Sequence, residues 1–305
     1  MTRPTAQDSY LVGLIGSGIG TSLSPMLHQA EADRLGLRYL YRLIDLDALG
    51  GPPDRVGELV HVAGDMGFRG LNITHPCKQL VLDHLDALAP QAEAVGAVNT
   101  VVFEGRGPDC RAVGHNTDVT GFAASFDQGL PEARLRRVVQ LGAGGAGAAV
   151  AHALLTRGTR HLAIADPVPD RAASLVARLN LRFGDGRATV ADSSDLGTVT
   201  SRADGLVHTS PTGMTGHPGL PLPADLVHPG LWVADVVYRP LETELLRLAR
   251  ARGCAVLNGL GMLAFQAADA FRLFTGREPD RARMLARATE LATSFPGPGA
   301  HASGP

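Results

Sequence analysis

The first candidate for chemistry is a lone lysine, because only one of the 28 residues that are Lys or Arg, Lys78, is a lysine. Arginine stays protonated at ordinary pH, whereas lysine can give and take a proton. Lys78 ends the polar cluster Asn72-Ile73-Thr74-His75-Pro76-Cys77-Lys78, which begins in a short run expected to form a strand. Ligands of doubly wound sheets bind beyond the carboxyl ends of strands, so this position favours a catalytic lysine over a stray surface lysine.

Two further polar clusters lie at the ends of expected elements. They are Ala97-Val98-Asn99-Thr100 and Gly114-His115-Asn116-Thr117-Asp118. Lys78 paired with Asp118 would suit proton transfer to or from a substrate hydroxyl. Thr74 and Asn99 could then bind the neighbouring hydroxyls. The structural alternative for Asp118 is to cap the helix expected from about residue 121.

A glycine-rich loop in the second half has the spacing of a dinucleotide site. The segment Gly142-Ala143-Gly144-Gly145-Ala146-Gly147 fits G-x-G-x-x-G, follows the apolar run 137–141 and opens the helix expected at 148–157. Such glycines permit a tight turn and a close approach of the backbone to a pyrophosphate. The next strand, 161–165, is followed by Asp166, whose carboxylate can accept hydrogen bonds from the adenosine ribose. Together these features predict dinucleotide binding.

Asp166 also bears on the choice between NAD and NADP. A carboxylate at this position repels a 2′-phosphate, and the next residue is Pro167 rather than an arginine. Arg171 is a candidate cofactor-binding residue, with packing on the start of its helix as the alternative. We therefore expect NAD as the cofactor, with NADP as the less favoured alternative.

A second glycine loop, in the first half, imitates this pattern. It reads Gly16-Ser17-Gly18-Ile19-Gly20-Thr21-Ser22-Leu23-Ser24-Pro25, and Asp45 ends the following strand. Thr21 takes the place of the third glycine, and the helix begins only at Ser24-Pro25, so we do not expect a dinucleotide here. Ser22 and Ser24 could instead donate to an anion such as a carboxylate, helped by the helix dipole. The alternative for Ser24 is an N-cap.

The composition excludes several classes of protein. The net charge of −2 and the pI near 6.6 do not suit a nucleic-acid partner. Mean hydropathy is +0.06, and no apolar run approaches the ~20 residues of a membrane span. The three cysteines form no CxxC, so neither a disulfide framework nor a metal site is expected. With no apolar stretch of a signal peptide at the N-terminus, we expect a cytoplasmic location and no membrane partner.

Alternation of expected strands and helices predicts an α/β protein of two domains with largely parallel sheets. The expected strands are 11–15, 39–44, 70–74, 98–103, 111–114, 137–141, 161–165, 189–191, 205–208, 232–237 and 255–257. The expected helices are 24–35, 56–66, 78–85, 148–157, 171–179, 262–274 and 280–293. The boundary is expected near 122–136, and the Pro/Gly-rich tail 295–305 is expected to be disordered.

Several motifs carry a family resemblance. In chain order they are SLSPMLH, NITHPCK, GAVNT, GHNTD, GAGGAG, HTSPTGM, YRPLET and GLGMLAFQA, within about residues 11–275. In content and order they resemble the shikimate dehydrogenase family, and most closely its NAD-preferring quinate/shikimate dehydrogenases. The closer resemblance rests on His75 within NITHP, and on Asp166 where the NADP enzymes typically carry an Asn-Arg-Thr-like segment.

The resemblance implies a role for each matching residue. Lys78 and Asp118 would form the catalytic pair, and Ser22 and Ser24 would hold the substrate carboxylate. Ring hydroxyls would be bound by Thr74, Asn99 and Gln266. The nicotinamide side of the cofactor would be lined by Thr209, Met214, Val236 and Gly259.

It also implies a domain plan. A substrate-binding catalytic domain, 1–122, would be completed by C-terminal helices at 259–294, and 123–258 would form a Rossmann NAD-binding domain. The protein would be a monomer or a homodimer.

The implied reaction is the reversible, NAD-dependent oxidation of quinate or shikimate to the 3-dehydro acid. Hydride would pass to the nicotinamide and the hydroxyl proton to Lys78, so oxidation is expected to rise with pH above neutrality. Cys77 and Ser24 depart from the pattern of some relatives, which leaves the ratio of quinate to shikimate open. The alternatives are an NADP-dependent biosynthetic shikimate dehydrogenase, a paralogue acting on an aminated ring, and a nucleotide-binding sensor without turnover. His75 and His115 are rival bases.

Overall fold

The computed structural model describes residues 9–105, 107–192 and 194–294, which form two compact units. We call Met1–Thr117 with Gln266–Arg287 the N-terminal unit, and Asp118–Phe265 with Ala288–Pro305 the C-terminal unit. The disorder expected for 295–305 concerns residues outside the described part of the chain.

The observed bounds differ by a few residues from the expected 1–122 with 259–294 and 123–258. Helix α4 (Asp118–Gly129) begins at Asp118, so all of it belongs to the C-terminal unit. Helix α9 (Leu260–Thr275) passes from the C-terminal unit to the N-terminal unit between Phe265 and Gln266. Because a helix is continuous, no change of composition marks this boundary in the sequence.

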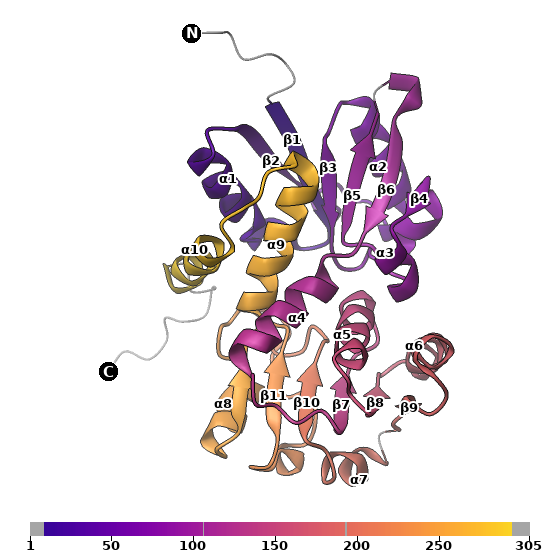
Figure 1. Ribbon diagram of the computed structural model, residues 1–305, viewed down its shortest axis with the longest axis vertical. Coiled ribbons are helices and arrows are strands. Elements are labelled where there is room, and N and C mark those ends of the chain that lie inside the picture. Colours follow the sequence, from indigo (N-terminus) through magenta and orange to yellow (C-terminus); the bar gives the residue numbers. More distant parts are fainter. Residues whose placement is uncertain (1–8, 106, 193, 295–305) are drawn as a thin grey trace. The chain divides into compact units, whose positions relative to one another are not determined.

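The N-terminal unit contains a six-stranded sheet in the order β2-β1-β3-β5-β6-β4 (Figure 1). Strand β5 pairs antiparallel with both neighbours, whereas the pairs β1–β2, β1–β3 and β4–β6 are parallel. This confirms the mainly parallel sheet. The strands are β1 (Ser9–Gly16), β2 (Arg38–Asp45), β3 (Gly70–Ile73), β4 (Ala87–Leu88), β5 (Thr100–Glu104) and β6 (Arg111–His115), and the first helices are α1 (Ser24–Arg34), α2 (Val56–Asp65) and α3 (Pro90–Val95).

One expected helix of this unit is wrong. Residues 78–85 form a turn followed by a 3₁₀ helix at Leu80–His84. The carbonyl of Lys78 accepts a hydrogen bond from the amide of Val98 at 2.8 Å. Because this bond ties the carbonyl to the chain entering β5, the α-helical pattern does not begin at Lys78. The short elements β4 and α3 were not predicted.

The polar clusters of this unit gather at one edge of its sheet. Strands β1, β2, β3 and β6 run in the same direction, so their carboxyl ends meet at the edge where β5 begins. The register pairs Gly16 with Asp45, and Thr100 with both Asn72 and His115. The topology therefore places the chain after β1, β3 and β6 along one edge.

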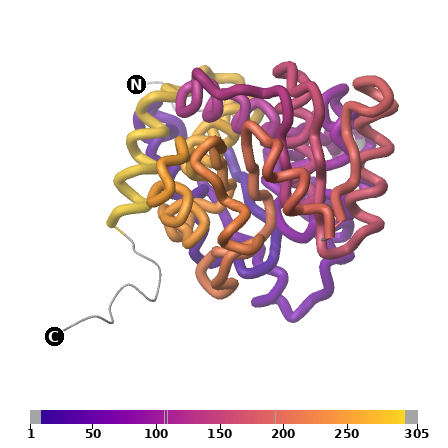
Figure 2. Tube along the Cα trace, turned by 90° about the horizontal axis from the view of Figure 1, so that it is seen from below, coloured from indigo at the N-terminus to yellow at the C-terminus, as the bar shows by residue number. Residues whose placement is uncertain are grey.

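An aromatic cluster attaches α1 and α9 to β2. The ring of His28 lies 4.9 Å from that of Tyr41 and 6.0 Å from that of Phe271, and its Nδ1 lies 2.8 Å from the Tyr39 hydroxyl. The buried carboxylate of Glu31 also accepts a hydrogen bond from the first amide before α10 (Arg281–Ser294). In both views the yellow segment of α9 lies beside the indigo N-terminal strands (Figures 1 and 2).

His28 is expected to make the protein sensitive to acid. Burial lowers the pKa of its imidazole from 6.5 to about 3. Between these values the unfolded chain binds a proton that the folded chain does not, so stability falls as pH falls. At pH 4.5 this loss in the free energy of unfolding amounts to about 3 kcal/mol. Urea unfolding of wild type and His28→Phe from pH 8 to 4.5 checks it, because the other histidines are common to both. We expect the free energy of unfolding to fall less with decreasing pH in the variant than in wild type. An equal fall in both proteins would contradict the prediction.

The C-terminal unit contains a six-stranded parallel sheet in the order β12-β11-β10-β7-β8-β9 (Figure 1). This is the doubly wound Rossmann order, and it confirms the expected fold class. The strands are β7 (Arg137–Leu141), β8 (His161–Ala165), β9 (Ala188–Val190), β10 (Gly205–His208), β11 (Trp232–Asp235) and β12 (Ala255–Leu257), and the remaining helices are α5 (Gly145–Thr156), α6 (Pro169–Phe183), α7 (Leu196–Thr200) and α8 (Glu244–Ala251).

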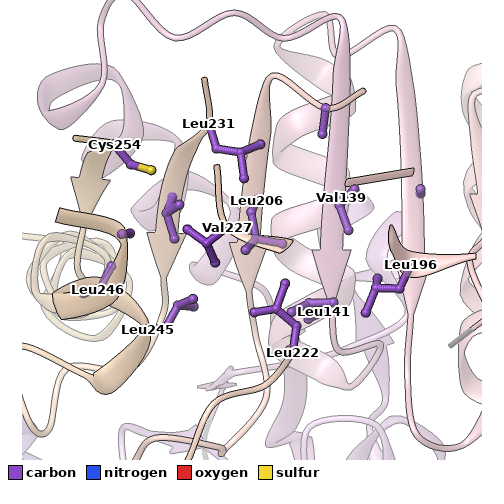
Figure 3. Close-up of a cluster of buried hydrophobic side chains, with 14 of the residues drawn as sticks. Val139, Leu141, Leu196, Leu206, Leu222, Val227, Leu231, Leu245, Leu246 and Cys254 are labelled. Carbon is purple, nitrogen blue, oxygen red and sulfur yellow. The ribbon is translucent and has the colours of Figure 1, made fainter. Parts of the chain in front are cut away.

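Two hydrophobic faces hold this sheet between its helices. Figure 3 shows the face on which Leu206 and Val139 of the sheet lie with Leu245 and Leu246 of α8. Strands buried on both faces read as continuous apolar runs, and for that reason they were readily predicted. Helices α7 and α8 were not predicted. Within the described residues, none of the helices combines the length and apolar character that a membrane span requires.

Candidate active site

The first glycine loop is filled by a carboxylate of the protein itself. Asp45 accepts hydrogen bonds from the amides of Gly18 and Ile19, each at 3.0 Å. The amide of Ser17 donates to the carbonyl of His75 at 3.0 Å. Because these donors are already engaged, the geometry supports the interpretation that this loop is not a dinucleotide site.

Ser22 and Ser24 lie at the start of α1. The helix begins at Ser24 with Leu23 as the N-cap residue, so the expected N-cap role of Ser24 is wrong. The reason is that Leu23 already has helical dihedral angles and its carbonyl accepts the first helical hydrogen bond, from the Leu27 amide at 3.1 Å. The amide of the buried Ser24 donates to Ser22 Oγ at 3.3 Å. The two hydroxyls thus lie at a positive helix end, which suits an anion.

Thr117 links Asn99 and Gln266, which the sequence predicts to bind one substrate. Asn99 is buried, and its Nδ2 donates to Thr117 Oγ1 at 2.9 Å. The Thr117 amide donates to Asn99 Oδ1 at 2.8 Å, and its hydroxyl donates to Gln266 Oε1 at 3.5 Å. Thr100 Oγ1 adds a further hydrogen bond to Asn99 Oδ1 at 3.0 Å. The amide groups of Asn99 and Gln266 are therefore neighbours in the N-terminal unit.

Thr74 and Lys78 lie in the turn that follows β3. The Thr74 amide donates to the carbonyl of Ile15 at 2.9 Å, and the Cys77 amide donates to the carbonyl of Thr74 at 2.8 Å. Lys78 is half-buried. Its backbone is tied to Val98, so both ends of the turn are fixed at the polar edge of the sheet.

Cys77 belongs to the core rather than to this polar edge. Its side chain is fully buried, and Sγ lies 3.7 Å from the carbonyl oxygen of Pro53. Burial raises the pKa of the Cys77 thiol to about 11, so the thiol stays protonated and unreactive at neutral pH. A departure from the family at this position therefore acts on packing.

Asp118 is the first residue of α4, and it is buried. The expected cap of a helix starting near residue 121 is therefore wrong, because the helix starts three residues earlier. An acid in the first turn is stabilised by the helix dipole. Asp118 and Lys78 belong to different units, and their pairing stays a prediction.

The second glycine loop has the geometry of a dinucleotide site. Gly142 has φ of +108°, and a Cβ there would lie 2.7 Å from Thr209 Oγ1, so only glycine fits. A Cβ on Gly147 would collide with the Gly142 carbonyl. Gly144 is the N-cap residue of α5, where no side chain caps the helix amides. A Cβ on Gly144 would meet no atom within 4 Å. Open space beside a helix N-terminus fits a pyrophosphate.

Asp166 connects this loop with the turn into α6. Its Oδ2 accepts a hydrogen bond from the Ala143 amide at 2.7 Å, and its Oδ1 accepts one from the Val168 amide at 2.9 Å. The half-buried carboxylate thus lies beside the loop, where a ribose-binding acid is expected. Arg171 is exposed in the first turn of α6.

The four residues expected near the nicotinamide have different surroundings. Thr209 is buried, and its hydroxyl donates at 3.0 Å to both the last carbonyl of β7 and the first carbonyl of the glycine loop. Met214 is 40% exposed. Gly259 packs directly on the Val236 carbonyl after β11. The structure thus brings Val236 and Gly259 together, and the Thr209 hydroxyl supports the loop.

Sequence reasoning missed a buried polar pair and a buried amide. His208 Nδ1 lies 2.9 Å from Asp235 Oδ1, and His208 Nε2 lies 2.6 Å from Ser210 Oγ. Gln140 reaches the carbonyls of the glycine loop. The available clue was a polar residue that ends the apolar strands β10 and β11 and, in β7, one that interrupts the apolar run after Arg137. The described residues contain no group of three or more His, Cys, Asp or Glu side chains suited to a metal ion.

Family models match three segments of the chain. Residues 14–101 match the shikimate dehydrogenase substrate binding domain, and residues 259–289 match the shikimate 5′-dehydrogenase C-terminal domain. Residues 138–215 match the saccharopine dehydrogenase NADP binding domain.

Whole-chain relatives agree with these matches. A shikimate dehydrogenase (NADP(+)) of Streptomyces avermitilis is 71% identical over 94% of this chain and 97% of its own. A quinate/shikimate dehydrogenase (NAD(+)) of Corynebacterium efficiens is 47% identical over 93% of this chain and 99% of its own. A quinate dehydrogenase from Corynebacterium glutamicum in complex with NAD has a TM-score of 0.84 at 45% identity, covering 93% of this chain and 99% of that one. The chain therefore belongs to the shikimate dehydrogenase family of oxidoreductases, which bind a nicotinamide dinucleotide.

Proposed function

We propose that this protein catalyses the reversible, NAD-dependent oxidation of quinate or shikimate to the 3-dehydro acid. The observation that carries the choice of NAD is the Asp166 carboxylate, held beside the glycine loop by the amides of Ala143 and Val168. A negative charge there favours ribose hydroxyls and repels a 2′-phosphate.

The names of the relatives divide on this point. The 71% identical relative is named for NADP, whereas the 47% identical relative and the 45% identical solved structure are named for NAD. We favour NAD because cofactor choice depends on a few contacts at the ribose, and overall identity does not report them. NADP dependence is the alternative that the experiment below distinguishes.

The substrate side is proposed to bind a polyhydroxy acid. Ser22 and Ser24 at the start of α1 would bind its carboxylate. Thr74, Asn99 and Gln266 would bind its hydroxyls. Support for the last two comes from the network through Thr117, which holds both amides in one place.

Lys78, paired with Asp118, is proposed to move the hydroxyl proton. When bound, the nicotinamide ring supplies the hydride acceptor or donor. Lys78 in its neutral form would accept the proton from the substrate hydroxyl during oxidation and return it during reduction. Asp118, buried in the first turn of α4, would hold the lysine amine and stabilise its charged form.

Steady-state rates with quinate and shikimate, each with NAD and with NADP, test the proposal. We expect kcat/KM with NAD to exceed that with NADP by at least about tenfold, which corresponds to ~1.4 kcal/mol. The same preference should appear with both acids, because it arises at the ribose. A preference for NADP would overturn the cofactor assignment, and no turnover with either acid would overturn the reaction.

A further inference from the structure

The side chain of Gln140 is the one amide buried in the centre of β7, a strand of otherwise apolar side chains after Arg137. It is fully buried. Its Nε2 donates to the carbonyl of Gly142 at 2.9 Å and to the carbonyl of Gly147 at 2.9 Å. Two carbonyl oxygens require a donor between them, so the NH₂ group must face the loop.

This arrangement gains little for stability alone. Both amide hydrogens are used, but Gln140 Oε1 has no hydrogen-bond partner among the described residues. A buried oxygen without a partner costs about 1–3 kcal/mol. A leucine would avoid that cost but would lose the two hydrogen bonds of Nε2, each worth about 0.5–1.5 kcal/mol, so the two side chains are nearly equal in stability. The presence of a glutamine therefore calls for another reason.

The two carbonyls lie at the first and last glycines of the loop. Gly142 is the residue with φ of +108°, and Gly147 lies in the first turn of α5. The side chain of Gln140 therefore connects the two ends of the glycine-rich segment. Thr209 holds the same side, since its hydroxyl donates to the Gly142 carbonyl at 3.0 Å.

The planar peptide bond between Gly142 and Ala143 couples the Gly142 carbonyl, which Gln140 binds, to the Ala143 amide. In a trans peptide the C=O and the following N–H point in opposite directions. When the Gly142 carbonyl is held by Gln140, the Ala143 amide must point the other way, and there it donates to Asp166 at 2.7 Å. One peptide unit is thus fixed from both sides.

We propose that Gln140 is a positioning residue for dinucleotide binding, acting through the backbone of the glycine loop. It keeps the loop carbonyls turned inward and the Ala143 amide on Asp166, so that the open side of Gly144 at the start of α5 stays available to the pyrophosphate. The proposal needs dinucleotide binding but not the preference for NAD.

The test compares Gln140→Leu with wild type and with a matched control, Thr159→Val. Thr159 is a buried residue of the same unit whose Oγ1 also has no hydrogen-bond partner among the described residues. Calorimetric titration with NADH and NADPH gives Kd, steady-state kinetics give KM and kcat, and urea unfolding gives stability. Hydrogen exchange reports the Ala143 amide directly.

We expect Gln140→Leu to raise Kd and KM about tenfold for whichever dinucleotide wild type binds more tightly. Its kcat should stay within about threefold, and its free energy of unfolding should stay within about 2 kcal/mol of wild type. The Ala143 amide should exchange faster, and Thr159→Val should change neither Kd nor exchange. Wild-type Kd in a folded Gln140→Leu protein would overturn the proposal, as would a rise in Kd matched by Thr159→Val. Gln140→Met, which has the same chain length, replaces leucine if that variant does not fold.

Discussion

A Lys78→Arg variant is expected to lose about 10²–10⁴-fold in kcat for quinate and shikimate oxidation. The change keeps the positive charge but removes a group that can exchange a proton, because a guanidinium stays protonated at ordinary pH. KM for the acid should change much less, since charge and approximate reach are kept. Steady-state kinetics with the cofactor saturating measure both parameters.

Two further comparisons test a rival base, His75, and the proposed partner of Lys78, Asp118. His75→Asn removes an exposed rival base and should leave kcat within a few-fold of wild type. Asp118→Asn should lower kcat. A variant with both Lys78→Arg and Asp118→Asn should have a kcat only slightly below that of Lys78→Arg alone, because the effects of two residues that act as a unit are not additive. A Lys78→Arg enzyme with near-wild-type kcat would rule out Lys78 as the proton acceptor.

The single lysine offers a check that does not depend on turnover. Lys78 is the sole lysine in the sequence, so reductive methylation has only its amine and the α-amine as targets. Substrate and cofactor together should protect Lys78 and leave the α-amine reactive. Equal labelling with and without substrate would place Lys78 away from the bound acid.

An Asp166→Asn variant is expected to lower the ratio of kcat/KM with NAD to kcat/KM with NADP by about 100-fold. Loss of a charged hydrogen bond to the ribose costs about 1.5–3 kcal/mol with NAD. Removal of the carboxylate charge also relieves repulsion of the 2′-phosphate, which is about 1 kcal/mol for unit charges 4 Å apart in water. The asparagine oxygen can still accept the hydrogen bond from the Ala143 amide, so the loop keeps its anchor.

Asp170→Asn is the matched control. Asp170 carries the same charge four residues later in the first turn of α6 and is exposed. Its substitution should leave the cofactor ratio unchanged. If Asp166→Asn also leaves the ratio unchanged, the carboxylate serves the loop alone and the choice of cofactor lies elsewhere.

Much of the fold followed from local patterns. Strand β7 was predicted with its observed bounds, because a run such as RVVQL before a glycine-rich turn has few alternatives. The missed helix α8 begins at a Thr243 cap that local reading could have found. The wrong helix at 78–85 failed for a different reason, since the Lys78 carbonyl bonds to Val98, which lies 20 residues away in the sequence. Local propensity does not contain such a contact.

The sequence by itself determined the two α/β units, the dinucleotide loop and the position of its lone lysine. These depend on hydrophobic period, glycine sterics and residue type, all of which act over a few residues. Tertiary structure showed why one of two similar glycine loops is closed and the other open. In the first loop, Asp45 at the end of β2 accepts hydrogen bonds from the amides of Gly18 and Ile19. In the second loop, Asp166 after β8 accepts one from the Ala143 amide, and the space beside Gly144 stays open.

Tertiary structure also decided which polar residues act together. Thr117 joins Asn99 to Gln266, although Gln266 lies 149 residues after Thr117. Gln140 turns its amide toward two glycine carbonyls, and nothing in the strand pattern specifies that direction. The physical reason is that a side-chain hydrogen bond depends on distance and angle to within fractions of an ångström. Strand register and helix packing set those quantities, and they arise only when distant segments meet.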